Sequence, residues 1–282
     1  MKIGLCSAAG GVCTQPGVFG RVAEHAEAAG IESLWVSEHL VVSDPRTPPS
    51  PMEPTDPILD PVVSLAFAAA RTTTLRLGSG VIVLPLRNPL ILAKELASLD
   101  VLSEGRVLVG IGVGYVETEF RAIGVPFDHR GDRTDEYLGA MRAIWTQEHP
   151  AFEGRHVAFG GVQAHPRPVQ RPHPPIVVGG WTPPALRRAA EHGNGWYGWG
   201  FDHAETASTI DRLRATLQNA ARDPGLGELE ITVTPNGDVD LDAAQRYAAL
   251  GVDRLNLQVG EGTEADLQRF IDRIGTEIVG HV

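Results

Sequence analysis

Eight short apolar runs alternate with helical patterns along nearly the whole chain, and this alternation restricts the fold more than any other feature. The apolar runs cover 2–6, 32–37, 75–83, 106–112, 175–180, 195–199, 229–234 and 254–259. The helical patterns cover 18–29, 61–71, 88–103, 116–123, 132–147, 183–192, 204–221, 240–250 and 263–278. Strands that alternate with helices are typical of parallel βαβ units. The sequence therefore predicts an α/β protein with a parallel sheet.

The number of repeats favours a closed barrel over an open sheet. The apolar runs are apolar throughout, as expected for a parallel sheet that is covered on both faces. A doubly wound open sheet is the alternative, but eight repeats in one chain favour a (β/α)₈ TIM barrel. We therefore expect residues 1–282 to form a single domain. Residues 148–175 are rich in Pro, Gly, Arg and His, and they predict an insertion that can hold a small hairpin.

Composition and charge argue against several classes of partner. The chain has 24 basic and 35 acidic residues and a formal net charge of −11, whereas nucleic acids and anionic membranes bind basic surfaces. The N-terminus lacks a signal-peptide pattern, and no window reaches the ~18 apolar residues of a membrane span. The two cysteines, Cys6 and Cys13, do not suggest a disulfide framework. We expect a soluble, cytoplasmic protein that binds neither nucleic acid nor membrane.

Functional groups of a TIM barrel lie where strands end and helices begin. The 32–37 run leads directly into Glu38 and His39. Histidine titrates near neutral pH and can pass a proton, although a structural histidine on the barrel rim fits the position equally well. Several other strand ends contain glycine, which lets a ligand approach the backbone closely. These strand ends are where the sequence predicts a binding site.

One of these ends carries a stronger signal than the others. In 177–186 (VVGGWTPPAL) a strand, two glycines, Thr182 and two prolines lead into a helix. Free amides at a helix start bind phosphate, so this stretch predicts an anion site, with a plain helix cap as the alternative. The 110–115 stretch (GIGVGY) lacks the spacing of a dinucleotide fingerprint. We predict no metal site, because the chain has no His-Glu-x-x-His or Cys-x-x-Cys motif.

Four stretches together resemble the bacterial-luciferase-like flavin and deazaflavin oxidoreductases, and the coenzyme F420-dependent branch in particular. They are AEAAGIESLWVSEH (26–39), the whole of 77–115, GVPFDHRGDRTDEYL (124–138) and PIVVGGWTPPALRRAAEHGNGW (175–196). The resemblance covers nearly the whole chain. It implies a luciferase-like barrel with the cofactor ring at the C-terminal mouth. It also implies a bulge in the third strand with a non-proline cis peptide, here Gly80–Val81, behind the ring.

The resemblance also implies roles for individual residues. His39 and Glu38 would be catalytic: His39 would hydrogen-bond the substrate or move its proton, and Glu38 would orient His39 or contact the ring. The cofactor-binding residues would be His39, Gly80, Val81, Gly112, Gly114, Tyr115, Gly179, Gly180, Trp181, Thr182 and Trp196. Among them, Gly112 and Gly114 would line the ring. Residues 179–182 would hold the phosphate, and Tyr115 and Trp196 would wall the pocket.

The implied activity is hydride transfer between reduced F420 and a small organic substrate. Sugar-phosphate dehydrogenases of this family carry an acid where this sequence has Tyr115, so we expect an apolar or aromatic substrate. Loops 44–61 and 148–175 would form its walls. Two alternatives stay open: an FMN-dependent monooxygenase that uses oxygen, and a barrel that binds flavin without catalysis. The resemblance also favours a homodimer.

Overall fold

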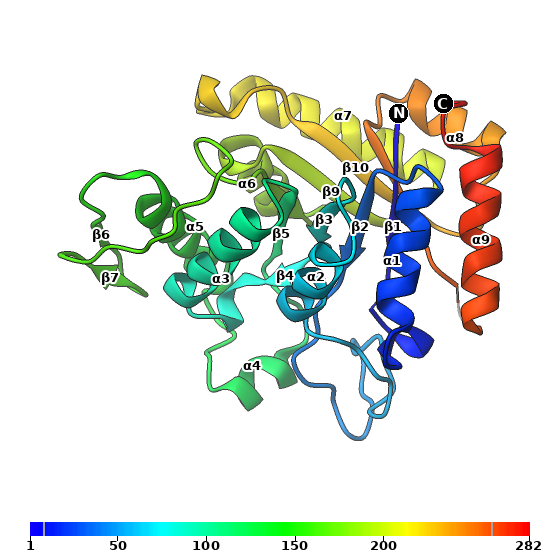
Figure 1. The fold of residues 1–282 in the computed structure, drawn as a ribbon. Coiled ribbons are helices and arrows are strands. Elements are labelled where there is room, and N and C mark those ends of the chain that lie inside the picture. The colour runs from blue at the N-terminus through cyan, green and yellow to red at the C-terminus, as the bar shows by residue number, and fades with distance from the viewer. Residues whose placement is uncertain (8, 261) are drawn as a thin grey trace.

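The protein is a closed barrel of eight parallel strands surrounded by helices (Figure 1). The computed structural model describes residues 1–7, 9–260 and 262–282. The barrel strands are β1 (Lys2–Cys6), β2 (Ser33–Val36), β3 (Arg76–Ser79) continued by β4 (Ile82–Val83), β5 (Val107–Gly112), β8 (Ile176–Gly179), β9 (Gly195–Phe201), β10 (Glu230–Pro235) and β11 (Arg254–Gln258). Strand β3 pairs with both β2 and β5, and this pairing closes the ring. The predicted (β/α)₈ TIM barrel is confirmed.

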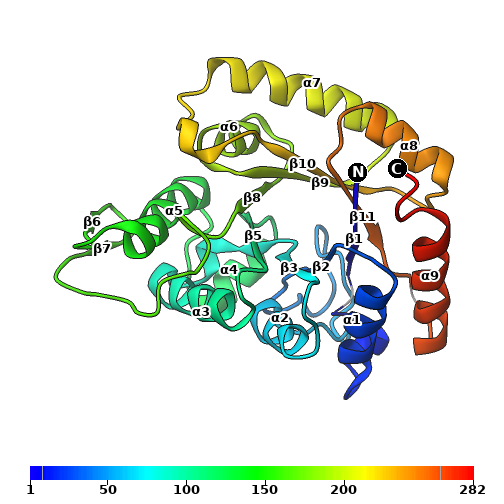
Figure 2. The ribbon, with the colours of Figure 1, turned by 45° about the horizontal axis from the view of Figure 1, so that its top comes forward.

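In the described part of the chain, eight helices surround the barrel, and Figure 2 shows them from nearer the barrel axis. They are α1 (Val18–Ala28), α2 (Pro61–Ala69), α3 (Pro89–Leu102), α5 (Arg130–Thr146), α6 (Pro183–His192), α7 (His203–Asn219), α8 (Leu241–Ala249) and α9 (Glu264–Glu277). The shorter α4 (Glu117–Ile123) and the 3₁₀ helices η1 (Gly11–Thr14), η2 (Leu84–Leu86) and η3 (Pro224–Leu226) lie in connections. Within the described residues, no helix is both long enough and apolar enough to cross a membrane.

The apolar residues form two main layers, one outside the barrel wall and one inside it. The outer layer lies between strands and helices and contains most of the buried aliphatic side chains, such as Leu34 of β2. The inner cluster comes from five different strands, and it consists of Cys6, Trp35, Leu108, Val177 and Tyr197, with Val81 packed against it. Leu34 and Trp35 face opposite sides because successive side chains of a strand alternate between the two faces.

Polar side chains occupy the part of the interior next to β10 and β11. Thr232, Thr234 and Asn256 are buried there. Arg254, the first residue of β11, is also fully buried and pairs with Glu32 and Glu230. Glu230 and Arg254 begin their strands and Glu32 directly precedes β2, so the three charged residues lie at the end of the barrel opposite the mouth.

The predicted strand 75–83 is interrupted. Strand β3 ends at Ser79 and β4 begins at Ile82, and the Gly80–Val81 peptide between them is cis. Beyond the interruption, Ile82 pairs with Ile111 of β5. The expected bulge with a non-proline cis peptide is therefore present at the predicted bond.

Residues 148–175 form the expected insertion. It contains a small antiparallel hairpin of β6 (Phe152–Glu153) and β7 (Ala158–Phe159), which projects from the barrel at the left of Figure 1. The buried carboxylate of Asp100 in α3 accepts hydrogen bonds from the backbone amides of Val169 and Gln170. These bonds attach the end of the insertion to the barrel.

Candidate active site

The C-terminal strand ends meet at one mouth of the barrel, together with α4 and the loop after β2, at the bottom of Figure 1. The bulge at Gly80 and Val81 forms part of this mouth, and both residues are half-buried. A Cβ atom on Gly112 would lie 2.8 Å from Val81 Cγ2, and one on Gly179 would lie 3.1 Å from Val81 Cγ1. The glycines of two neighbouring strands therefore make room for the Val81 side chain.

This packing corrects the expected role of Gly112. It is buried against Val81 and does not open onto the mouth as a ring-lining residue would. Gly114 and Gly180 serve a different purpose, because their φ angles of 76° and 109° lie in the region that L side chains rarely adopt. They turn the chain out of β5 and β8.

His39 lies just beyond β2, and its ring is held by a residue outside the site predicted from the sequence. The Nδ1 atom of His39 lies 3.3 Å from Oε2 of Glu119, which is buried in α4. The other carboxylate oxygen of Glu119 accepts the backbone N–H of Leu40 at 3.1 Å. The Tyr115 ring lies edge-on to the imidazole, with 6.2 Å between the centroids. No local spacing connects Glu119 to residue 39, so only the fold brings them together.

Glu38 has partners other than His39, and this corrects the expectation that it orients the histidine. Its buried carboxylate accepts the Val83 N–H at 2.6 Å and Nε–H of Arg87 at 2.7 Å. Arg87 also bonds Asp60, the N-cap of α2. Because successive side chains of an extended segment point to opposite sides, Glu38 and His39 contact different neighbours. Glu38 anchors the strand beyond the bulge.

Exposed aromatic side chains surround the mouth. Tyr115 and Trp181 follow β5 and β8, and Trp199 lies near the end of β9; they are 53%, 51% and 38% exposed. Burial, and to a lesser degree the Glu119 carboxylate, raises the pKa of Tyr115, so its phenol is neutral. Trp199 was not predicted as a site residue, and it lies edge-on to Tyr197 with centroids 6.3 Å apart. These side chains give the mouth a flat, apolar rim.

Trp196 does not wall the mouth, contrary to expectation. It is fully buried in the outer layer, where its Nε1–H donates to the Gly180 carbonyl at 2.7 Å. Its neighbour Tyr197 faces the interior instead, with its hydroxyl 2.7 Å from Oγ1 of Thr234. Burial raises the pKa of Tyr197 well above its usual value, so the hydroxyl stays neutral. Trp196 supports the end of β8 from behind.

The start of α6 offers fewer anion-binding groups than the sequence suggested. Thr182 is the N-cap, and its side chain makes no capping hydrogen bond. Pro183 and Pro184 occupy the first helical positions and have no amide hydrogen, so two of the usual donors of a helix start are missing. Positive charge is nearby, because Nη1–H of Arg212 donates to the Trp181 carbonyl at 3.4 Å.

The mouth fits a flavin or deazaflavin. Such a group needs an apolar surface for its ring, and Val81 with the aromatic rim provides one. It also needs cations for its phosphate. Arg130 and Arg212 each donate to a backbone carbonyl that follows a barrel strand: Nε–H of Arg130 donates to Gly114 at 3.0 Å, and Nη1–H of Arg212 donates to Trp181. Neither arginine forms an ion pair within the described part of the chain.

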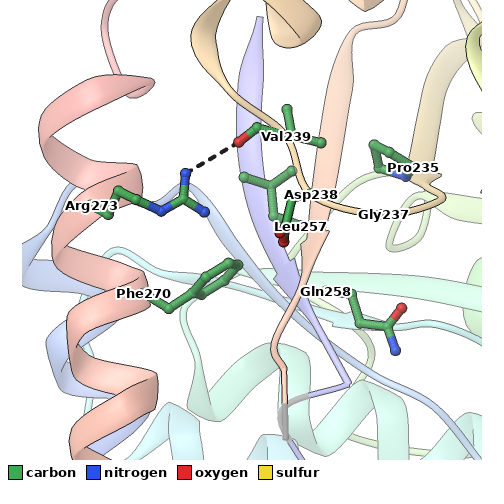
Figure 3. Close-up of a pocket in the computed structure, with 8 residues that line it drawn as sticks. All are labelled: Pro235, Gly237, Asp238, Val239, Leu257, Gln258, Phe270 and Arg273. Carbon is green, nitrogen blue, oxygen red and sulfur yellow. Dashed lines mark hydrogen bonds between the residues drawn. The ribbon is translucent and has the colours of Figure 1, made fainter.

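The described residues line a groove and a smaller hollow near this end of the barrel. A groove of about 390 Å³ runs between the loop after β2 and α4, and it is lined by Val41, Val42, Ser43, Asp44, Pro45, Thr47, Thr118, Arg121 and Ala122. The groove lies within the size range of ligand sites. A smaller hollow beside α9, shown in Figure 3, is lined by residues such as Asp238 and Arg273. At about 20 Å³ it has room for a single water.

Comparison with known proteins gives one family. The family model of the luciferase-like monooxygenases matches residues 6–271. An uncharacterised protein of Mycobacterium tuberculosis is 33% identical over 264 residues, which are 90% of this chain and 91% of that protein. An F420-dependent glucose-6-phosphate dehydrogenase of Kineococcus radiotolerans is 31% identical over 82% of this chain and 66% of its own length.

Other similar proteins are monooxygenases. An FMNH₂-dependent dimethylsulfone monooxygenase of Pseudomonas putida is 36% identical over 132 residues, which are 45% of this chain and 36% of that protein. The crystal structure of the monooxygenase RslO1 from Streptomyces bottropensis superimposes with a TM-score of 0.80 at 25% identity, covering 100% of this chain and 99% of that one. Proteins similar to this chain therefore include both F420-dependent and FMN-dependent enzymes.

Proposed function

The chain belongs to the luciferase-like monooxygenase family, and on that premise we propose that it is a coenzyme F420-dependent oxidoreductase acting on a small organic molecule. The observation that carries the proposal is His39, held by Glu119 at the same mouth of the barrel as the Gly80–Val81 bulge. A residue that moves protons is expected next to a site of hydride transfer. The F420-dependent relative, similar over 82% of this chain, supports the choice of cofactor.

Different residues of the mouth would bind the cofactor and transfer the proton. Val81 and the aromatic rim would contact the ring, while Thr182, Arg130 and Arg212 would hold the phosphate. When bound, the reduced deazaflavin supplies a hydride from ring carbon 5. His39 would donate a proton to the oxygen of a carbonyl substrate in the direction of reduction, and it would accept that proton in the reverse direction.

We propose that the substrate is apolar or aromatic. Tyr115, Trp181 and Trp199 present flat apolar surfaces at the mouth, and aromatic surfaces bind flat apolar ligands well. The groove between the loop after β2 and α4 also carries apolar side chains, among them Val41, Val42 and Pro45. Glu38 and Glu119 are both already engaged by other groups, which leaves little reason for a cationic substrate.

An FMN-dependent monooxygenase is the second candidate, because an FMNH₂-dependent relative and a structurally similar monooxygenase favour it. The cofactor decides between the two reactions, since a deazaflavin has carbon at position 5 and does not readily activate oxygen. A barrel that binds flavin without catalysis is the third candidate. Binding alone separates the first two candidates, and turnover separates both from the third.

The test is a paired fluorescence titration of the purified protein with F420 and with FMN. We expect tight binding of F420 and weak binding of FMN. A His39→Ala variant should still bind the cofactor, but its turnover should fall by about 10²–10⁴-fold. Tighter binding of FMN would replace the proposal with the monooxygenase, and oxygen consumption would then be measured. If neither cofactor binds, both enzymatic candidates fail.

We also propose a homodimer formed through barrel helices. Val63 and Phe67 of α2 and Ile91 and Leu102 of α3 are exposed apolar side chains on neighbouring helices. Their exposure supports a partner surface there. Sedimentation of the wild type should give a dimer, and Phe67→Glu should shift it toward the monomer. A monomeric wild type would contradict this expectation.

A further inference from the structure

Among the described residues, the Glu119 carboxylate has two hydrogen-bond partners, and both belong to the segment that carries His39. Oε1 accepts the N–H of Leu40 at 3.1 Å, and Oε2 lies 3.3 Å from Nδ1 of His39. A backbone amide can only donate, so Oε1 is an acceptor in this contact. Only 1% of Glu119 is exposed. The carboxylate therefore has few water molecules that could take the place of these partners.

An ionised carboxylate can only accept hydrogen bonds, and this determines where the ring proton of His39 lies. If Oε2 accepts, Nδ1 of His39 must carry the hydrogen. In the neutral ring Nε2 then has the free lone pair. Within the described part of the chain, Nε2 of His39 makes no hydrogen bond. It is thus the ring nitrogen left for a ligand, and a proton can be accepted or released there.

The position of Glu119 is rigid because α4 is attached on two sides. Its neighbour Phe120 is fully buried in a small apolar cluster with Val83 and Leu86. Thr118 of α4 also hydrogen-bonds Ser43 in the loop after β2. A carboxylate on such a support can fix the orientation of an imidazole, as second partners of histidine do in other sites.

We propose that Glu119 is a positioning residue that holds His39 in the Nδ1–H tautomer and directs Nε2 to the substrate. The part of this proposal that concerns the substrate rests on the proposed function, because it assumes that His39 exchanges a proton with the substrate. The tautomer itself is a property of the protein without cofactor. The same carboxylate accepts the backbone N–H of Leu40, the residue after His39. It therefore determines both the position of the His39 ring and which ring nitrogen carries the hydrogen.

The direct test is nitrogen NMR of the protein labelled with ¹⁵N in histidine, without cofactor and at alkaline pH. The ring signals of His39 are assigned by their loss in His39→Gln. We expect the Nδ1–H form to dominate in the wild type. In Glu119→Gln the amide can either donate or accept, so the two tautomers should become mixed. The exposed Glu117→Gln, on the same helix, is the matched control and should leave the signals unchanged.

A dominant Nε2–H form in the wild type would overturn the proposal without any variant. Unchanged His39 signals in a folded Glu119→Gln would overturn it as well. If Glu119→Gln does not fold, Glu119→Asp still tests the idea, because a retained carboxylate should keep the Nδ1–H form dominant. A mixture of tautomers in Glu119→Asp would count against the proposal.

Kinetics then separate this inference from the proposed function. With F420 and a substrate in hand, Glu119→Gln should lower kcat by roughly 10²-fold and leave the Kd for F420 unchanged, with partial recovery in Glu119→Asp. If the tautomer changes as expected but no turnover with F420 is found, the proposed function fails and the role of Glu119 stands. If turnover exists and kcat is unaffected in Glu119→Gln, the positioning role fails.

Discussion

At the scale of single residues, the glycines of the mouth are explained by Val81. Glycine at a strand end suggests a close approach of ligand to backbone. Here the group that approaches the glycine backbone is the Val81 side chain. Its methyl groups lie next to the positions where Gly112 and Gly179 would carry a Cβ atom. Gly78 makes room in the same way for the Trp35 ring inside the barrel. These small residues allow large ones to fill the barrel.

The packing of Val81 on Gly112 predicts a coupled pair of substitutions. Gly112→Ala would place a methyl group 2.8 Å from Val81 Cγ2, and we expect this overpacking to lower the free energy of unfolding by about 1–3 kcal/mol. In a Val81→Ala background the same substitution should cost much less, because the opposing methyl groups are gone. Urea denaturation of both single variants and the double variant measures the coupling. Strictly additive effects would contradict this packing.

At the scale of elements, helix α1 is joined to the segment before β3 by one carboxylate. Oε1 of Glu27 accepts the backbone amides of Thr73, Thr74 and Leu75 and the hydroxyl of Thr74. Burial raises the pKa of this carboxyl, but the amide and hydroxyl donors together outweigh burial and lower the pKa to about 2. The charged form is therefore favoured by folding.

The low pKa of Glu27 predicts a dependence of stability on pH. A lowered native pKa adds stability above the ordinary carboxyl value, and that stability is lost as the pH falls through about 2. Glu27→Gln keeps an acceptor oxygen but loses the charge, so it should cost roughly 1 kcal/mol at neutral pH. The difference from wild type should shrink as the pH falls below about 5. Chemical denaturation across this pH range measures it.

The exposed Glu148→Gln is the control for this experiment. Its side chain makes no ion pair within the described residues, so its effect should stay within about 0.5 kcal/mol at every pH. A Glu27→Gln difference that grows toward acid pH would show that the carboxylate is not stabilised in the way described here.

The α6 start is an element whose anion-binding ability depends on one side chain. Because Pro183 and Pro184 have no amide hydrogen, the free hydroxyl of Thr182 gains importance for the phosphate. Thr182→Val should weaken the binding of F420 by about 0.5–1.5 kcal/mol, the usual net contribution of one hydrogen bond. Binding of the deazaflavin riboside, which lacks the phosphate, should stay unchanged. Fluorescence titration measures both ligands, and equal losses for the two would argue against a phosphate contact at Thr182.

At the scale of the whole molecule, one buried arginine connects strands from opposite ends of the chain. Nε–H and Nη2–H of Arg254 donate to the two carboxylate oxygens of Glu32, each at 2.9 Å, and Nη1 pairs with Glu230. These bonds link β11 and β10 to the segment before β2. The guanidinium also lies over the Trp35 ring, 5.4 Å from its centroid. Ion pairs therefore connect the strands at the N-terminal end of the barrel, and an apolar cluster lies in its interior.

Removal of this arginine should affect the stability of the entire barrel. Arg254→Met would leave Glu32 and Glu230 without their buried partner, and we expect a loss of about 3–5 kcal/mol in the free energy of unfolding. Arg246→Met removes an exposed arginine from a pair with Asp242, and it should cost less than about 1 kcal/mol. Guanidinium denaturation compares the two variants. Similar costs for both would mean that the buried pair contributes no more than a surface pair.

Much of the architecture follows from the sequence, because strand and helix patterns are local. The alternation of apolar runs and helical periods identifies each barrel unit, and Pro89 after Asn88 marks a helix start that the structure places at the same residue. The resemblance, in turn, located the cis peptide at Gly80–Val81. His39 was identified because it follows a strand, and strand ends gather at one mouth whatever the details of packing.

Only the tertiary structure decided which side chains meet. Glu119 is far from His39 in the chain, and closure of the barrel, which places α4 beside the segment after β2, brings them together. Whether Trp196 or Tyr197 faces the interior could not be decided from a strand that is buried on both faces, because both faces are apolar there. Local patterns determine where strands and helices form. Contacts between distant units depend on register and closure, and a single sequence carries no local signal of those.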